Sequence, residues 1–324
     1  MPNGATSVRL ASLDSLRGVA ILAVVVSHCL GTVRLGEGLD PAVVQLGRGG
    51  VTLFFLLSGY LIFHNLQRQS FGTFLCRRFF KVMPSYWCNI AVILAADLCL
   101  DNVAHHPVGS YLAGVFAVSD LLGIEAVSGV FWTLLIEIKF YIFIALQFAL
   151  FRGRYTHGVL AALLLAEAMT WAVRGHGSLT LAYFPVFYLG IEISQADAAG
   201  WNRRAMLRLA VVTTALAASL ALFLDQHQLG SAAYLVASVL SFVVVLRKSL
   251  SHRLAGFLGV TSYSNYLYHS LIAGLLFSWF GNQQHALAAG AILALALVTT
   301  TAFGAALYGL VEVPMVRLGR RLTE

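Results

Sequence analysis

Charged side chains are scarce in this sequence of 324 residues. Asp, Glu, Lys and Arg make up 11% of it and hydrophobic residues 59%, against about 25% and about 45–50% in ordinary soluble domains. A water-soluble globule of this composition would be hard to keep in solution. The apolar residues come in long runs, such as Phe140 to Phe151 and Ala286 to Val298, and not at every third or fourth position. These runs predict an all-α fold, a polytopic transmembrane helical bundle.

Prolines and cysteines are also few. With six prolines, and without a Ser/Pro-rich or acidic stretch, the sequence offers no linker, so we expect one membrane domain over residues 1–324 and no fused soluble domain. The four cysteines show neither CxxC spacing nor the nearby histidines of a zinc site. We therefore expect buried, inert thiols and no metal. The first apolar segment lacks a small-residue cleavage site, so we expect it to stay as a helix and not to be removed as a signal peptide.

At about 20 residues per span, the apolar runs predict about ten transmembrane helices. They cover 11–30, 49–66, 83–101, 130–151, 158–174, 179–196, 208–225, 231–246, 256–280 and 286–312. If the N-terminus is cytoplasmic, most of the 21 Lys and Arg residues fall on the cytoplasmic side, in agreement with the positive-inside rule. We therefore expect both termini to be cytoplasmic. The stretch 103–129 is only moderately apolar and is either an external loop with a short re-entrant helix or one more span.

Two ionisable residues, Arg17 and His28, lie in the first predicted span. Eleven residues are about three helical turns, so the two side chains share one face of the helix and are about 16 Å apart along its axis. Ionisable groups that face lipid are costly, and they normally face the bundle interior or a wet cavity and serve a function. The alternative is that Arg17 snorkels to the membrane surface and His28 only bonds a neighbouring helix.

The segment from Leu13 to Ala20, followed by His28, resembles the opening of the acyltransferase-3 family, membrane acyltransferases marked by an Arg, ten residues and a His. The likeness continues along the chain in the same order as in the family. Its other segments are 49–62, 74–84, 131–137, 258–269 and 311–314. One departure is Thr133, where the family pattern is usually written with Ser. Six motifs in the right order make coincidence an unsatisfactory explanation.

The resemblance implies transfer of an acyl group, most often acetyl from acetyl-CoA, to a hydroxyl of a carbohydrate or another envelope or secreted molecule. Family members modify surface polysaccharides, lipopolysaccharide, nodulation-type oligosaccharides, peptidoglycan and macrolides. It further implies a bacterial inner-membrane location, acyl-CoA as a donor substrate with no permanently bound cofactor, and membrane lipids but no nucleic acid as partners.

A sugar hydroxyl is nearly un-ionised at neutral pH, so a base must take its proton as it attacks the thioester carbonyl. A neutral imidazole suits that task, and His28 is the candidate base, with a covalent acyl-histidine intermediate as the variant. Glu137 lies near the outer end of its predicted span, at the same depth as His28, and could orient the imidazole as in a triad. Its alternative role is a structural ion pair with Lys139 or Arg17.

The expected donor path uses the basic residues near the cytoplasmic side. Arg77, Arg78 and Lys81, in a predicted basic loop, could hold the phosphates of CoA by charge-assisted hydrogen bonds. Arg17 would lie at the cytoplasmic end of the helix face that it shares with His28. The long arm of CoA would then extend along this face from Arg17 to His28. Alternatively, the basic residues of the loop only set the orientation of the protein in the membrane and bind lipid headgroups.

The polar run 262–268, unusual for a span, suits a hydrated cavity wall or an acceptor groove. His269 and Tyr263 are therefore candidate substrate-binding residues, although interhelical hydrogen bonding explains the hydroxyls equally well. Ser58 and Trp132 are candidates for lining the donor path, or are close-packing and interfacial residues. The histidines in or near loops, His106 among them, receive no role.

Two other functions compete with acyl transfer. A glycan transporter or flippase would use Arg17, Glu137 and His28 as a polar pathway through the membrane, although the sequence shows no convincing internal repeat. A non-catalytic membrane partner would keep the fold only, and the intact pair of Arg17 and His28 argues against it.

Overall fold

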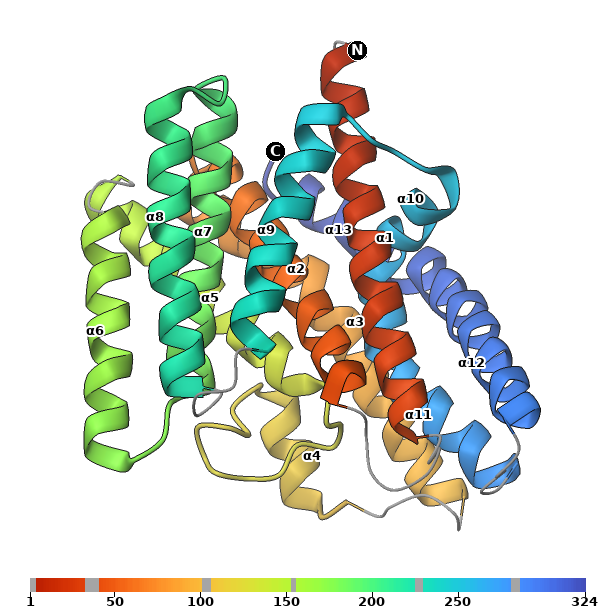
Figure 1. Ribbon diagram of the computed structural model, residues 1–324. Coiled ribbons are helices and arrows are strands. Elements are labelled where there is room, and N and C mark those ends of the chain that lie inside the picture. Colours follow the sequence, from red (N-terminus) through yellow and green to blue (C-terminus); the bar gives the residue numbers. More distant parts are fainter. Residues whose placement is uncertain (1–3, 33–40, 101–105, 153–155, 225–229, 281–285) are drawn as a thin grey trace. The chain divides into compact units, whose positions relative to one another are not determined.

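The computed structural model describes residues 4–32, 41–100, 106–152, 156–224, 230–280 and 286–324, and within these ranges the chain is helical and has no strand (Figure 1). The helices are α1 (Gly4–Thr32), α2 (Pro41–Leu66), α3 (Phe71–Cys99), α4 (Val108–Val115), α5 (Phe131–Phe151), α6 (Thr156–Arg174), α7 (Leu179–Ala198), α8 (Arg203–Ser219), α9 (Gly230–Lys248), α10 (Arg253–Val260), α11 (Ser262–Phe280), α12 (Ala286–Leu307) and α13 (Val313–Arg321). Two short π-helical segments, Leu220–Leu224 and Tyr308–Glu312, follow α8 and α12. The predicted all-α membrane fold is confirmed.

Eight helices in the described part of the chain are long and apolar enough to cross a bilayer. They lie in α1, α2, α3, α5, α6, α8 with the π-helical segment after it, α9, and α12 with the segments that follow it. Two helices that the sequence placed in the membrane, α7 and α11, are not among them, because α7 contains Glu192 and Asp197 and α11 opens with a run of polar residues. The number of spans and the side of the termini therefore stay predictions.

Two predicted boundaries were wrong. α3 begins at Phe71 and not at 83, so Arg77, Arg78 and Lys81 lie on a helix and not in a loop, and Pro84 lies inside α3. Membrane helices tolerate such an internal proline when neighbouring groups satisfy the freed backbone. The predicted span 256–280 is interrupted at Thr261, between α10 and α11.

The stretch 103–129 contains one short helix, α4, and turns that lead to α5. Eight residues of helix rise about 12 Å, too little for a hydrocarbon core of about 30 Å, so an additional span is ruled out within 106–129. Residues 103–105 lie outside the described part. The expectation of buried thiols holds for Cys29 alone, since Cys76 and Cys88 are half-buried and Cys99 is exposed.

The chain divides into two compact units, each made of three separated stretches of sequence. Unit 1 comprises residues 1–20, 48–74 and 142–259, and unit 2 comprises 21–47, 75–141 and 260–324. Because the stretches alternate, the division does not cut the sequence into consecutive domains, and the predicted single domain is neither supported nor contradicted by it.

In unit 1, α6, α7, α8 and α9 pack in sequence order, each against the next (Figure 1). α7 forms the centre, with every residue from 183 to 193 buried. Gly59 of α2 and Gly190 of α7 permit a close approach, since a Cβ at Gly59 would collide with the carbonyl oxygen of Phe187 and one at Gly190 with that of Leu56. Small residues at such crossings are typical of membrane helices, whose association depends on close packing.

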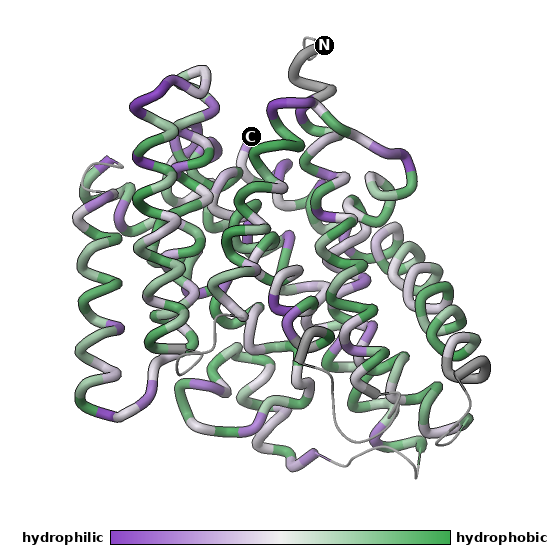
Figure 2. Tube along the Cα trace, viewed as in Figure 1, coloured by the Kyte–Doolittle hydropathy of each residue, from purple (hydrophilic) through white to green (hydrophobic). Residues whose placement is uncertain are grey.

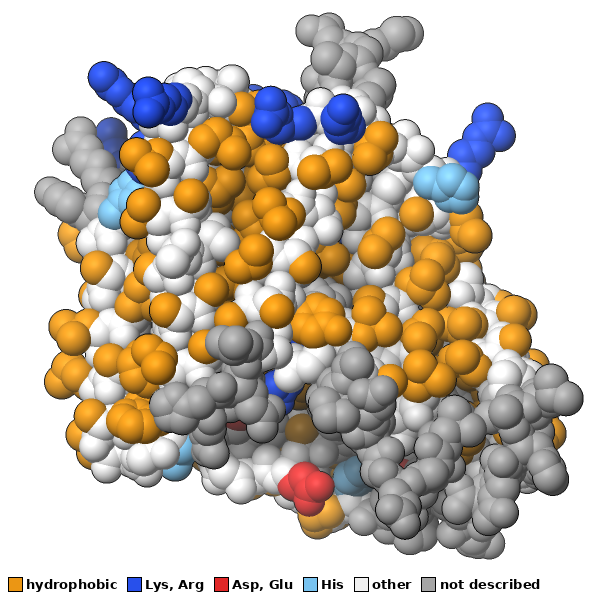
Figure 3. Space-filling model, in the orientation of Figure 1, with side chains coloured by type: hydrophobic (Ala, Val, Ile, Leu, Met, Phe, Trp, Pro, Cys, Tyr) orange, Lys and Arg blue, Asp and Glu red, His pale blue; other side chains and the backbone are white. Residues whose placement is uncertain are grey.

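Most residues of α6, α8 and α9 are hydrophobic, and many of the polar ones lie near the helix ends (Figure 2), which leaves mostly hydrophobic side chains on the outer faces. Exposed side chains on these faces include Leu207, Val211, Leu240 and Val244. Lys and Arg side chains gather at one end of α8 and α9 (Figure 3), where Arg203 begins α8 and Lys248 ends α9. This surface is typical of helices that face lipid, with basic side chains at the boundary between membrane and water.

In unit 2, α11 packs along α12 (Figure 1). A Cβ at Gly304 of α12 would strike the Asn265 side chain, which shows how close the two helices run. The polar residues of α11 serve partly as interhelical ties: Ser264 Oγ donates to Glu312 Oε2 over 3.1 Å, and the Asn89 amide of α3 donates to the Leu267 carbonyl over 3.0 Å. These contacts fix α11 in place beside α3 and α12.

Candidate functional site

Unit 2 brings together two histidines that lie at opposite ends of the sequence. The rings of His28 on α1 and His269 on α11 meet edge to face, with centroids 4.9 Å apart and an interplanar angle of 75°. His269 is fully buried, whereas the His28 side chain is exposed on its other side. One imidazole is thus held in the core, and the other presents a surface that a substrate can reach.

The protonation pattern of His269 follows from its contacts. Nδ1 lies 2.6 Å from the Tyr266 carbonyl oxygen, and since a carbonyl only accepts, Nδ1 must carry the proton. In the neutral ring Nε2 is then an acceptor, and among the described residues it has no hydrogen-bond partner. A buried acceptor without a donor is costly, and the described residues supply no donor to His269 Nε2.

Tyr266 links α11 to the start of α5. Its hydroxyl donates to the Val130 carbonyl over 2.8 Å and lies 2.5 Å from Thr133 Oγ1, which therefore acts as the donor to it. The Tyr266 ring also packs against His269, with centroids 5.4 Å apart. Thr133, which stands where the family pattern has Ser, thus supplies the hydroxyl that this network needs.

Glu137 accepts a hydrogen bond from the Tyr141 hydroxyl, one turn further along α5, over 2.5 Å. The Arg78 guanidinium lies over the Tyr141 ring, 5.2 Å from its centroid, a cation–π geometry. The two residues weighed as structural ion partners of Glu137 pair elsewhere, Lys139 with Asp120 and Arg17 with Asp14. The orientation of His28 by Glu137 stays a prediction.

The cationic residues expected to hold CoA fall in both units. Arg17 belongs to unit 1, where its Nη1 lies 3.4 Å from Asp14 Oδ1 and both side chains are partly exposed. Arg77, Arg78 and Lys81 lie in unit 2 on the first turns of α3, and Arg77 Nε donates to Thr323 Oγ1 over 2.8 Å. All three of these side chains are half-buried, and their binding of CoA stays a prediction.

The candidates for substrate binding are also divided between the two units. Tyr263 lies in unit 2 with His269, and its hydroxyl donates to the Val82 carbonyl over 2.9 Å. Trp132, half-buried, follows Phe131 at the start of α5 in the same unit, whereas Ser58 lies on α2 in unit 1. Interhelical bonding accounts for the Tyr263 hydroxyl, and its contact with a substrate stays a prediction.

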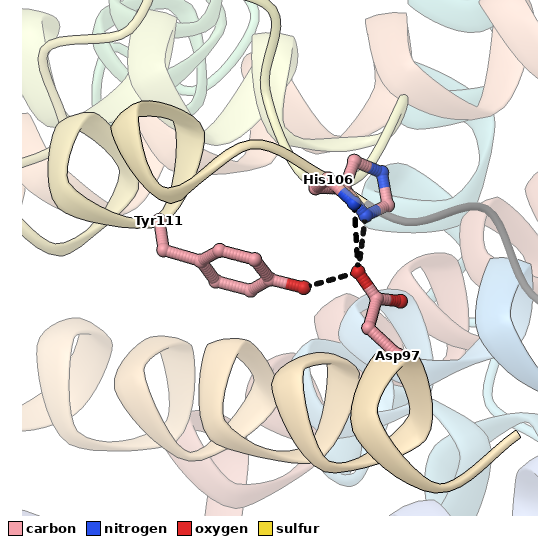
Figure 4. Close-up of polar contacts among 3 residues, drawn as sticks. All are labelled: Asp97, His106 and Tyr111. Atoms are coloured by element: carbon pink, nitrogen blue, oxygen red, sulfur yellow. Dashed lines mark hydrogen bonds and ion pairs between the residues drawn. The ribbon is translucent and has the colours of Figure 1, made fainter.

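A second polar cluster in unit 2 was missed by the sequence reasoning. Asp97, near the end of α3, is contacted by His106 and by Tyr111 of α4 (Figure 4). The signal was present, since an aspartate inside an apolar span marks a functional site by default. Among the described residues no group of three or more His, Cys, Asp or Glu side chains is arranged to hold a metal ion.

Comparison with known proteins gives a match over most of the chain. Residues 10–309 match the family model described as an acyltransferase domain. No solved structure is similar enough to count as a match.

Three curated relatives show what the chain resembles. Nodulation protein 10 of Rhizobium leguminosarum bv. viciae is 27% identical over 54% of this chain and 53% of the relative. The putative membrane-bound transacylase BcsY of Komagataeibacter xylinus is 29% identical over 55% and 47%. Peptidoglycan O-acetyltransferase OatA of Listeria monocytogenes is 29% identical over 40% and 23%. The chain thus spans about half the length of the first two relatives and less of the third.

Proposed function

Because this chain belongs to the acyltransferase-3 family, we propose that it is an integral membrane O-acyltransferase that moves an acyl group, acetyl in the simplest case, from acyl-CoA to a hydroxyl of a carbohydrate or another envelope acceptor. The names of two relatives, a transacylase and a peptidoglycan O-acetyltransferase, support this reaction class. We place the protein in the bacterial inner membrane.

The pair of His28 and His269 is the observation that carries the proposal. His28 takes the proton of the acceptor hydroxyl while the hydroxyl oxygen attacks the thioester carbonyl carbon. The new carbon–oxygen bond forms, the carbon–sulfur bond breaks, and the thiolate of CoA receives the proton from His28. His269, buried behind His28, packs against the His28 ring and so helps to fix the orientation of that ring.

The central experiment supplies acetyl-CoA labelled in the acetyl group to membranes that contain the protein. We expect label in the glycan fraction and free CoA in equal amounts. A flippase would move glycan across the membrane without consuming acetyl-CoA. If no label passes to an acceptor, the proposed reaction is wrong.

Arg17→Ala is expected to raise the apparent KM for acetyl-CoA about tenfold, since a charge-assisted hydrogen bond contributes roughly 1.5–3 kcal/mol and about 1.4 kcal/mol is a factor of ten. The matched control is Asp14→Asn, which removes the other half of the ion pair. If Arg17 serves only that pair, both variants raise KM equally; if it binds CoA, Arg17→Ala alone has the large effect.

Removing both Arg77 and Arg78 is expected to raise the KM for acetyl-CoA at least tenfold with little change in kcat, because phosphate binding is lost in the ground state and the transition state alike. The control removes another basic pair, Arg247 and Lys248, at the end of α9 in unit 1. An unaltered KM in Arg77→Ala/Arg78→Ala would show that these residues do not bind CoA and serve only to set the orientation of the protein in the membrane.

A further inference from the structure

Asp97 is a buried carboxylate, 5% exposed, with three donors on one of its oxygens. Oδ2 accepts the His106 backbone N–H over 3.1 Å, lies 2.8 Å from His106 Nδ1, and accepts the Tyr111 hydroxyl (Figure 4). Its other oxygen, Oδ1, has no partner among the described residues. The three donors come from the turn before α4 and from α4 itself, so the carboxylate holds this segment against α3.

These contacts determine which nitrogen of His106 is free to accept. Because an ionised carboxylate only accepts, Nδ1 must be the donor, and in the neutral ring Nε2 is then the acceptor. Burial, and after it the hydrogen bond to Asp97 and the charge of Asp97, raise the pKa of Tyr111, so the phenol remains a donor at neutral pH. Asp97 thus orients His106 as a carboxylate orients an imidazole in other sites.

His106 lines a pocket of about 260 Å3 in unit 2. Its walls are Ile93 of α3, the stretch 127–129 before α5, and one face of α11, and three of the lining residues carry hydroxyls, Ser128, Ser270 and Ser278. The volume is slightly below the usual range of ligand pockets, about 300–1,000 Å3, and suits one ring-sized group. Hydroxyls beside an oriented imidazole favour a ligand that itself carries several hydroxyls.

The pocket adjoins the pair of His28 and His269 through α11 and the start of α5. Ser270 follows His269, and Ser270, Gly274 and Ser278 repeat at four-residue intervals, so the pocket follows one face of α11 for about 12 Å. At the other wall, Gly129 precedes Val130, whose carbonyl accepts the Tyr266 hydroxyl beside His269. The pocket therefore lies beside the segments of α11 and α5 that hold His269 and its contacts.

We propose that this pocket binds the acyl acceptor as a single sugar ring, with His106 Nε2 accepting a hydrogen bond from one ring hydroxyl and Asp97 positioning His106. The assignment rests on the proposed acyl transfer and adds to it where the acceptor lies. His106 is a binding residue, remote from the proton transfer at His28, and Asp97 is a positioning residue that acts through His106.

The first test fills the pocket. A Cβ at Gly274 meets no atom within 4 Å, so Gly274→Leu places its side chain into the pocket without disturbing the fold. Gly290 on α12 is the matched control, an exposed helical glycine that also has nothing within 4 Å. With labelled acetyl-CoA as the donor and the glycan fraction of native membranes as the acceptor, we expect Gly274→Leu to lower transfer at least tenfold. Its KM for acetyl-CoA and the activity of Gly290→Leu should stay within twofold of wild type.

The second test separates binding from structure. His106→Ala is expected to lower transfer about tenfold at an unchanged KM for acetyl-CoA, since one hydrogen bond is lost. Asp97→Asn should lower transfer less, because the amide still holds His106 but no longer fixes its tautomer. A structural role would instead lower the thermal midpoint of His106→Ala and raise its KM for acetyl-CoA.

The outcomes are distinct from those of the proposed function. Wild-type transfer in Gly274→Leu, or equal loss in Gly274→Leu and Gly290→Leu, would overturn the acceptor pocket while His28-dependent transfer still supports the reaction. If transfer does not depend on His28 at all, the proposed mechanism is wrong, and the acceptor pocket fails with it.

Discussion

Replacing His28 by alanine is expected to lower the rate of acyl transfer about 10²–10⁴-fold, the usual contribution of a general base. The reason is chemical: with His28 gone, no side chain placed at the attacking hydroxyl takes its proton. His269 does not substitute for it, because His269 is fully buried and its Nδ1 is bound to the Tyr266 carbonyl. The measurement is transfer of label from acetyl-CoA to the membrane glycan fraction.

The control for this variant is His176→Ala. His176 is exposed in the loop between α6 and α7, and its Nδ1 lies 3.2 Å from the neighbouring Gly177 carbonyl oxygen. We expect wild-type activity from it, and an equal thermal midpoint for both variants and the wild type in detergent. Unchanged acylation in His28→Ala would show that the base is another group.

The same assay separates direct transfer from a covalent intermediate. An acyl-histidine would place label on the wild-type protein before the acceptor is added, and hydroxylamine would release it. Label on wild type and none on His28→Ala would identify the covalent route, whereas label that appears only in the acceptor supports direct transfer.

The largest effect on stability is expected from valine at Gly59. A side chain there meets the backbone carbonyl of Phe187, which cannot rotate away, so α2 and α7 must separate. Overpacking costs about 1–3 kcal/mol and occasionally more, and we expect a loss at or above roughly 3 kcal/mol because the obstacle is backbone. The readout is the thermal midpoint of the detergent-solubilised protein.

Gly190→Val tests the same crossing from α7, where a Cβ would strike the Leu56 carbonyl. Both single variants force the same two helices apart, so the double variant should lose clearly less than the sum of the two losses. Gly290→Val, on an open surface of α12, serves as the control and should leave the midpoint nearly unchanged. A Gly59→Val protein as stable as this control would contradict the close approach.

Most of the helices were predictable from the apolar runs alone, and nine of the ten predicted spans each correspond to one long helix, whereas 256–280 divides into two. Two boundaries were predicted wrongly. The helix predicted to begin at 83 begins at Phe71, and Pro84 is accommodated within it. The break between α10 and α11 falls at Thr261, directly before the polar run 262–268, and hydropathy gives no sign of it.

For the site, the sequence identified individual residues better than their partners. His28 and His269 were both predicted to act, but the order of spans does not say which helices are neighbours, so their ring contact came only from the fold. For Glu137 the fold adds a contact that the sequence did not suggest, the hydrogen bond from Tyr141 one turn away. His106 received no role because it falls in or near a loop, and its contact with Asp97 came only from the fold.

The contact between His28 and His269 also has a consequence for biosynthesis. Chains are made and generally fold from the N-terminus, so α1 enters the membrane early while α11 is among the last helices to be synthesised. Until then, His28 has an imidazole exposed where its ring partner has yet to arrive. The contact between the two rings can therefore form only near the end of synthesis.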